Sequence, residues 1–201
     1  MSMAVTGVLA TGSCSRDVRL AGREVREVKV RPVTQYGMVL DEQATPEQVV
    51  HVLLRAIRED FLARTQEERQ AALDKQFDIC AGNVIEARNR SGLSAEEFVY
   101  NVVYRWTPTA SHYVSNFETD WEKAQKRYVR TETKRPATSA GDVPECEVRI
   151  QLDDPSGDPN ARVVMIVWLA KDSGLWRVLH LGFDPTTRSI GEQEHAERPA
   201  P

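Results

Sequence analysis

Apolar residues recur every three or four positions through much of the first half of the chain, which is the spacing of an amphipathic α-helix. The first such segment covers residues 45–63. Its apolar stripe consists of Val50, Leu53, Leu54, Ile57 and Phe61. His51 falls on the opposite, charged face of this predicted helix. The spacing therefore predicts a helix that buries one side and exposes the other.

Three predicted helices begin with a capping box, in which a Ser or Thr and a Glu or Gln three residues later bond to each other's backbone amides. The pairs are Thr45 with Gln48, Thr65 with Glu68, and Ser94 with Glu97. The second helix is expected to carry one apolar face made of Leu73, Phe77, Cys80 and Val84. A short fourth helix is predicted around Trp121, Ala124 and Tyr128. Residues 131–144 are then expected to form a polar surface loop.

The last third of the chain changes to the alternating pattern of β-strands. Residues 145–152, 161–170 and 175–183 are the three predicted strands, and the Asp-Ser-Gly turn before residue 175 makes the last two a hairpin. Helices followed by antiparallel strands are typical of an α+β domain. We therefore expect an N-terminal segment over residues 1–40, a single domain over 41–183, and a disordered tail over 184–201.

Composition adds few constraints on function. The chain has 201 residues, of which 41% are hydrophobic and 28% charged, as in an ordinary globular domain. A net charge of −4 gives no electrostatic reason to expect binding to nucleic acid or to an anionic membrane. The sequence contains no pattern that predicts a cofactor, and its four histidines are too dispersed to predict a metal site.

The three cysteines raise two separate questions. Cys14 ends an apolar, small-residue segment, as the attachment cysteine of a bacterial lipoprotein would, but no Lys or Arg precedes it. A start codon placed too far downstream would explain the missing basic residues, and a disordered N-terminus is the alternative. The protein is accordingly expected in the cytoplasm, or in the cell envelope if Cys14 carries lipid. Outside the cytoplasm Cys80 and Cys146 would remain as a disulfide pair, although free cysteines are common in cores.

The closing hairpin over residues 163–183 enters its last strand through Gly174, Trp176, Arg177 and Val178. This pattern, together with the preceding helices, resembles the NTF2-like superfamily over about two-thirds of the chain. The resemblance implies N-terminal helices packed in the concave face of a curved antiparallel sheet, although these helices are longer than the family needs. The superfamily includes isomerases, dehydratases, hydrolases and binding modules, so the fold alone does not predict the function.

His180 is the main candidate for chemistry. Strand alternation places it on the same side as Trp176 and Val178, and the hairpin places Trp168 opposite that face. It would then be either an acid–base group in an apolar pocket or a buried histidine bonded to the backbone. Acid–base chemistry would need a carboxylate, for which Asp60 and Asp78 are the candidates. Capping, a nearby arginine partner or solvent is the structural explanation for each of them.

A second group of candidate ligand contacts follows the third helix. His112 and Tyr113 lie in a predicted loop, where binding residues are common. Together with Trp168, Trp176 and His180 they form the predicted ligand-binding set. We therefore expect a non-enzymatic module that binds a small apolar ligand or a protein partner, with the hairpin as a candidate homodimer surface. The alternative is a lyase- or isomerase-type enzyme that acts on a small apolar molecule and uses His180 as its acid or base.

Overall fold

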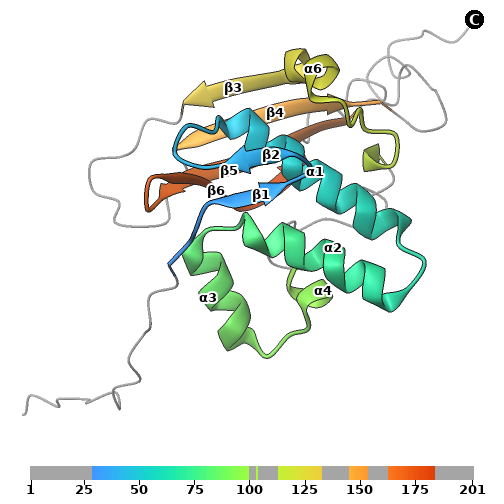
Figure 1. The fold of residues 1–201 in the computed structure, drawn as a ribbon, viewed down its shortest axis with the longest axis vertical. Coiled ribbons are helices and arrows are strands. Elements are labelled where there is room, and N and C mark those ends of the chain that lie inside the picture. Colours follow the sequence, from blue (N-terminus) through green and yellow to red (C-terminus); the bar gives the residue numbers. More distant parts are fainter. Residues whose placement is uncertain (1–28, 100–102, 104–112, 133–144, 154–162, 184–201) are drawn as a thin grey trace, which may run out of the picture.

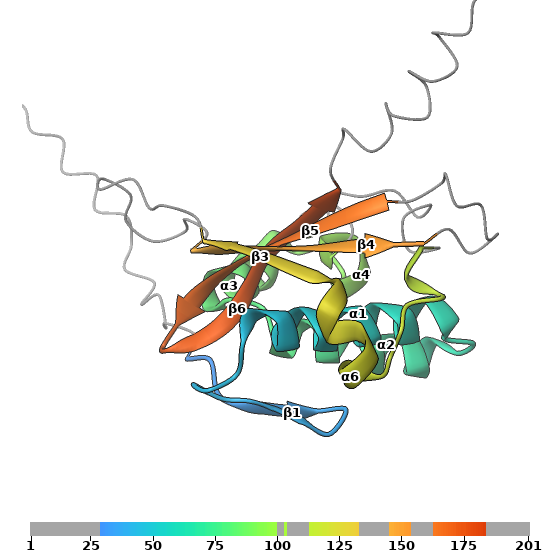
Figure 2. The ribbon, with the colours of Figure 1, turned by 90° about the horizontal axis from the view of Figure 1, so that it is seen from above.

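The computed structural model describes residues 29–99, 103, 113–132, 145–153 and 163–183. These residues form an α+β structure in three layers (Figures 1 and 2): a small β-hairpin, then a helical layer, then a four-stranded antiparallel sheet. Helix α1, Pro46–Leu62, lies between the hairpin and the sheet and contacts both. Because it has a neighbour on either side, this helix can bury more than one of its faces.

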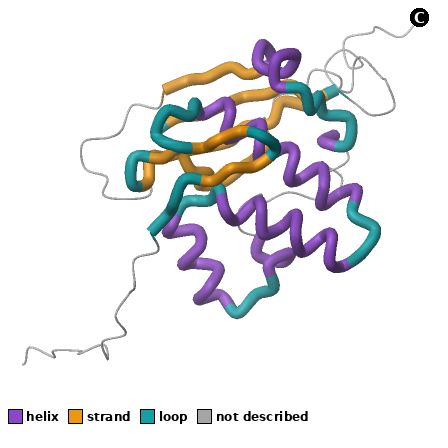
Figure 3. Tube along the Cα trace, viewed as in Figure 1, coloured by secondary structure: helices purple, strands orange, loops and turns teal. Residues whose placement is uncertain are grey.

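The remaining helices of the described part follow α1 in sequence (Figure 3). They are α2 (Gln66–Asp78), α3 (Gly82–Ser91), α4 (Ala95–Phe98), α6 (Trp121–Ala124) and the 3-10 helix η2 (Gln125–Arg127). All three predicted capping boxes are confirmed, and they cap α1, α2 and α4. Within the described part of the chain, no helix combines the length and apolar character that crossing a lipid bilayer requires.

Helix α1 is enclosed on more sides than its apolar stripe predicts. Of the predicted stripe, Val50, Leu53, Leu54 and Ile57 are buried, whereas Phe61 is 39% exposed. Val49, Val52 and Ala56 are also fully buried, and so is His51, whose exposed fraction is 0%. The expectation that His51 lies on a solvated, charged face is therefore wrong. The expectation fails because the face of α1 that carries His51 is covered by rings from later in the chain, those of Phe117 and Trp121 among them.

The second predicted helix does not continue to Val84. Helix α2 ends at Asp78, and Ile79–Ala81 run beside β6, where Cys80 forms a parallel bridge with Val178. The amide of Val178 donates to the carbonyl of Ile79 and the amide of Ala81 donates to the carbonyl of Val178, both at 2.9 Å. Because this backbone pairing satisfies groups that a helix would otherwise use, the chain breaks here and restarts as α3.

The four strands of the sheet lie in the order β3-β4-β5-β6, and each pairs antiparallel with its neighbour. Their bounds are Tyr128–Glu132, Cys146–Leu152, Val163–Asp172 and Leu175–Phe183. The three predicted strands are confirmed. Strand β3 was not predicted, because only its first residue, Tyr128, is buried, and the other four are exposed and show no alternation.

One face of the sheet, which we call the inner face, packs against α1. Its buried side chains alternate along β4 and β5 and include Val148, Val167 and Leu169, all fully buried together with Val178 of β6. Leu53, Leu54 and Ile57 of α1 belong to the same core. Burial of this many aliphatic side chains is the main stabilising contribution to the fold.

The N-terminal hairpin consists of β1, Val33–Gln35, and β2, Met38–Leu40. Its turn residues Tyr36 and Gly37 have φ angles of 53° and 75°, as a two-residue hairpin turn requires. The Arg55 guanidinium carbon and the Lys75 ammonium nitrogen lie 4.4 and 5.0 Å from the centroid of the Tyr36 ring. Leu40 is fully buried in the core, so the packed structure includes residues that the sequence analysis placed in the N-terminal segment.

Candidate functional site

A β-bulge in the last strand determines where His180 points. Leu169 pairs with Val178, whereas the preceding residue of β5, Trp168, pairs with His180, so Leu179 is an extra residue in β6. Val178 lies in the core, and the extra residue turns His180 to the other side of the sheet, the outer face. The expectation that His180 shares a side with Trp176 and Val178 is therefore wrong, and its position opposite Trp168 is confirmed.

His180 and Trp168 stack on this outer face. Their ring centroids are 4.3 Å apart and the ring planes differ by 14°, and both side chains are half-buried. Gly182 leaves room for the indole, because a Cβ atom at that position would lie 3.2 Å from a Trp168 ring carbon. Two local features therefore allow the stack: the bulge places His180 on the outer face, and the absence of a side chain at Gly182 leaves space for the Trp168 ring.

The stack belongs to a longer apolar strip along β5. We define the outer-face strip as Val164, Ile166, Trp168, Ala170 and His180, of which Ile166 and Ala170 are buried and the other three are half-buried. The neighbouring strand β4 carries polar residues on the same face, with Glu147 opposite Trp168 and Arg149 opposite Ile166. The Arg149 Nε and the Glu147 Oε1 are 2.6 Å apart. An aromatic pair beside a charged pair resembles the core and rim of a protein interface.

Trp176 lies on the inner face, away from this strip. Its half-buried indole packs against the core, and the Lys171 Nζ and Arg130 Cζ atoms lie 5.2 and 5.7 Å from its ring centroid. Tyr113 also packs half-buried against the core, and His112 and Cys14 fall outside the described residues. Of the predicted ligand-binding set, the structure brings together Trp168 and His180 and places Trp176 on the opposite face.

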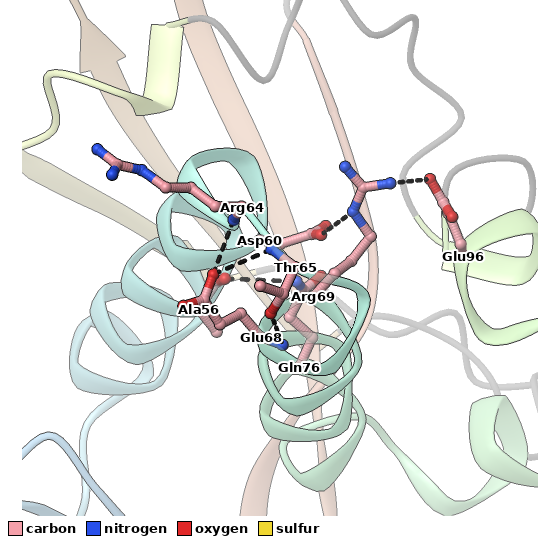
Figure 4. Close-up of polar contacts among 8 residues, drawn as sticks. All are labelled: Ala56, Asp60, Arg64, Thr65, Glu68, Arg69, Gln76 and Glu96. Atoms are coloured by element: carbon pink, nitrogen blue, oxygen red, sulfur yellow. Dashed lines mark hydrogen bonds and ion pairs between the residues drawn. The ribbon is translucent and has the colours of Figure 1, made fainter.

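Asp60 is held among the helices (Figure 4). Its side chain is buried, and its Oδ1 lies 3.7 Å from the Nε of Arg69 on α2. Arg69 also reaches Glu96 of α4, with 3.4 Å between Nη1 and Oε1. Below them Gln76 Nε2 donates to the carbonyl of Ala56 at 3.5 Å. Arg69 thus links α1, α2 and α4 through Asp60 and Glu96. Asp60 belongs to α1 on the inner side of the sheet, whereas His180 lies on the outer face.

Asp78 lies at the end of α2 and is tied to the N-terminal hairpin. Gln35 Nε2 donates to Asp78 Oδ2 at 3.3 Å and to the Lys75 carbonyl at 3.2 Å. Burial raises the pKa of the Asp78 carboxyl, with a further contribution from the charge of Asp74, whereas the Gln35 bond and the charge of Arg177 act in the other direction. These contacts give Asp78 a joining role between hairpin and helix.

Arg177, next to this junction, is the largest fully buried side chain in the described part of the chain. Its guanidinium donates to the carbonyl of Trp176 at 2.8 Å and to the carbonyl of Arg31 at 2.5 Å. Burial lowers its pKa, and the nearby negative charge of Asp172 counteracts this. Arg177 therefore ties the β5–β6 hairpin to the segment before β1. Asp172 ties the same hairpin to the start of α3, because its carboxylate accepts the Gly82 amide at 2.8 Å.

The two described cysteines are buried thiols. They lie at opposite ends of one row across the sheet, which runs from Cys146 through Leu169 and Val178 to Cys80. Three strand spacings separate them by about 14 Å, whereas a disulfide needs Cα atoms less than about 7 Å apart. Burial raises the pKa of the Cys80 thiol to about 12 and of the Cys146 thiol to about 11. Neither is therefore a thiolate nucleophile near neutral pH.

A buried polar pair that the sequence did not predict joins α1 to β3. His51 Nε2 lies 3.2 Å from the Thr119 carbonyl, and Nδ1 lies 2.9 Å from the Tyr128 hydroxyl. Because a carbonyl can only accept, Nε2 carries the proton, and Nδ1 accepts from the hydroxyl. Burial lowers the pKa of His51 and raises that of Tyr128. The imidazole is therefore neutral near pH 7, and its complete burial makes it a structural group.

The candidate catalytic residues do not form one constellation. His180 lies on the outer face, Asp60 among the helices and Asp78 at the hairpin junction. Among the described residues, no three His, Cys, Asp or Glu side chains gather in a way that could hold a metal ion. The sequence matches no family model, no curated protein and no solved structure. Among these predicted site residues, the structure stacks Trp168 on His180.

Proposed function

We propose that this protein is a non-enzymatic binding module that engages a protein partner through the outer-face strip, with Trp168 at its centre. The observation that carries the proposal is the stack of Trp168 on His180, half-buried, on the face of the sheet turned away from α1. Stacked aromatic rings within reach of solvent provide a large apolar contact area at low entropic cost. Tryptophan is also among the residues that contribute most to binding at interfaces.

A protein partner fits this surface better than a small apolar ligand. A small ligand is normally enclosed on most sides, and the enclosed region between sheet and helices is occupied by fully buried side chains such as Val148, Val167 and Leu169. The half-buried members of the strip, Val164, Trp168 and His180, instead lie on a sheet face. A charged pair, Glu147 with Arg149, lies beside them. Such a rim suits the polar periphery of a protein interface.

Two further parts of this proposal concern the family and the location of the protein. The order of helices followed by an antiparallel sheet that ends in a hairpin supports an NTF2-like architecture. A lipid on Cys14 would tether the module to a bacterial membrane, which the apolar segment before this cysteine supports. Intact-mass measurement of protein expressed with its upstream genomic sequence tests the tether, since acylation adds mass only at a processed Cys14.

The binding surface can be tested by site-specific photocrosslinking in cells. A photoreactive amino acid at Gln151, exposed on the same face, is expected to give a discrete adduct with one partner protein, whereas one at Arg90 of α3 is not. Trp168→Lys should remove the adduct, and Leu93→Lys, at an exposed apolar site between α3 and α4, should leave it intact. His180→Ala should weaken it.

Circular dichroism and thermal melting of each variant show whether it is folded. Adducts from position 151 that survive both Trp168→Lys and His180→Ala in folded protein would refute the proposal. The same conclusion would hold if position 90 gave the discrete adduct and position 151 gave none.

A further inference from the structure

The two edges of the sheet are unequal. The β6 edge is covered by Ile79–Ala81, which pairs with it through two backbone hydrogen bonds. No described strand pairs with the outer edge of β3, which runs along the upper rim of the sheet in Figure 1. The residues after Tyr128 are exposed there, and Val129 is 60% exposed. Backbone amides and carbonyls on such an edge are ready to pair with another strand.

The charges on this edge alternate in sign. Arg130 and Glu132 lie on the same face of β3, because their partners Val148 and Cys146 both lie on the inner face. The Arg130 Nη2 and Glu132 Oε1 atoms are 3.2 Å apart, and the side chains are 37% and 80% exposed. Thr131 stands between them and points to the outer face. This short segment therefore carries one positive and one negative charge, symmetrically placed about Thr131.

We propose that β3 pairs antiparallel with β3 of a second copy of this chain, so that the two four-stranded sheets form one continuous eight-stranded sheet. The two-fold axis of this dimer passes between the Thr131 residues of the two copies. In this register Arg130 of each copy lies opposite Glu132 of the other, so both cross-strand pairs combine opposite charges. A register centred on Arg130 or on Glu132 would instead place a like charge opposite itself. Charge complementarity thus selects a second copy and one register.

The geometry also agrees with the rest of the fold. The pairing uses the C-terminal part of β3, away from α6, which lies at the start of the strand (Figure 1). An edge strand whose charges all have the same sign would repel a second copy of itself. Because β3 carries one positive and one negative charge, an antiparallel copy places opposite charges next to each other and is attracted. The two-fold axis places the outer faces of both copies on the same side. The proposal does not depend on the partner of the outer-face strip.

A charge-swap experiment on the full-length chain tests the register. Arg130→Glu and Glu132→Arg each convert both cross-strand pairs into like-charge pairs, so each is expected to weaken dimerisation roughly tenfold or more in sedimentation equilibrium. The double variant, Arg130→Glu with Glu132→Arg, restores opposite pairs and should recover the wild-type dissociation constant within about threefold. A weaker double variant than either single one would contradict the register, and wild-type protein that stays monomeric at millimolar concentration would overturn the dimer itself.

Disulfide trapping provides an independent test. Residues that face each other across antiparallel strands have Cα atoms about 4.5–5.5 Å apart, which a disulfide can bridge. In a Cys14→Ser background, Thr131→Cys should form a linked dimer under mild oxidation, whereas Gln151→Cys, exposed on β4, should not. The native Cys80 and Cys146 are buried and should not react. Equal linking of both variants, or a dimer in which Thr131→Cys does not link, would exclude this interface.

Discussion

His51 and His180 each contact a tryptophan ring, in two regions of the molecule that use the imidazole differently. His51 lies edge-on to Trp121 with 5.3 Å between ring centroids, is fully buried, and has both ring nitrogens bonded. His180 stacks face to face on Trp168 at 4.3 Å and is half-exposed. The comparison shows that a histidine–tryptophan contact can stabilise the packing of a helix when it is fully buried. The same contact forms part of the molecular surface when it is only half-buried.

The largest expected difference between the two regions is in stability. His51→Ala leaves a cavity and removes the bonding partners of the Tyr128 hydroxyl and the Thr119 carbonyl, so it should lower the free energy of unfolding by about 2–4 kcal/mol. Urea denaturation followed by circular dichroism measures this value. Tyr128→Phe, which removes only the hydroxyl, should cost about 1 kcal/mol. A loss below about 0.5 kcal/mol for His51→Ala would show that the pair is not structural.

An intermediate effect is expected from pH. The pKa of His51 is lowered chiefly by burial and also by the charge of Arg55, whereas the Thr119 bond and the charges of Asp120 and Glu118 act to raise it. Below the ordinary histidine pKa of 6.5 the unfolded chain binds a proton that the folded protein does not, so stability falls as the pH falls.

The slope attributable to His51 can reach at most about 1.4 kcal/mol for each pH unit below 6.5, and it ends at the lowered pKa of the folded state. Unfolding of the wild type and of His51→Gln, compared at about pH 7.5 and about pH 5.5, isolates it. The variant should lose less stability on acidification than the wild type. An identical loss in both proteins would assign the pH dependence to other groups.

The smallest effect on stability is expected at the outer face. His180→Ala removes the stacking contact of a half-exposed ring, so the free energy of unfolding should fall by about 1 kcal/mol or less. The emission spectrum of Trp168 should nevertheless change, because the imidazole covers one face of its indole; comparison with a Trp168→Phe background assigns the signal. A stability loss as large as that of His51→Ala would mean that His180, like His51, has a structural role.

Local features of this fold could be predicted from the sequence, whereas the positions of both histidines could not. The capping boxes at Thr45, Thr65 and Ser94 depend on residues three positions apart, and the last two strands depend on alternation and a turn. These signals involve neighbours in the chain, so they predict the elements correctly. They also predicted that Trp168 lies opposite His180.

The remaining features depend on segments that are distant in sequence. The face of α1 that carries His51 is charged in its own helix and becomes buried only when residues 117–128 pack on it. Strand β3 carries exposed side chains and exists because β4 pairs with it. The outer position of His180 results from an unpaired extra residue, which no alternation pattern reveals.

The bulge at Leu179 also determines where this strand tolerates the loss of a residue. Loss of the codon for residue 179 would remove the extra residue and leave a regular ladder, in which Val178 still pairs with Leu169 and His180 with Trp168. Leu181 would stay on the inner face and the imidazole on the outer face. A deletion at this position should therefore be tolerated better than one in a regular part of the strand, where every later side chain would change face.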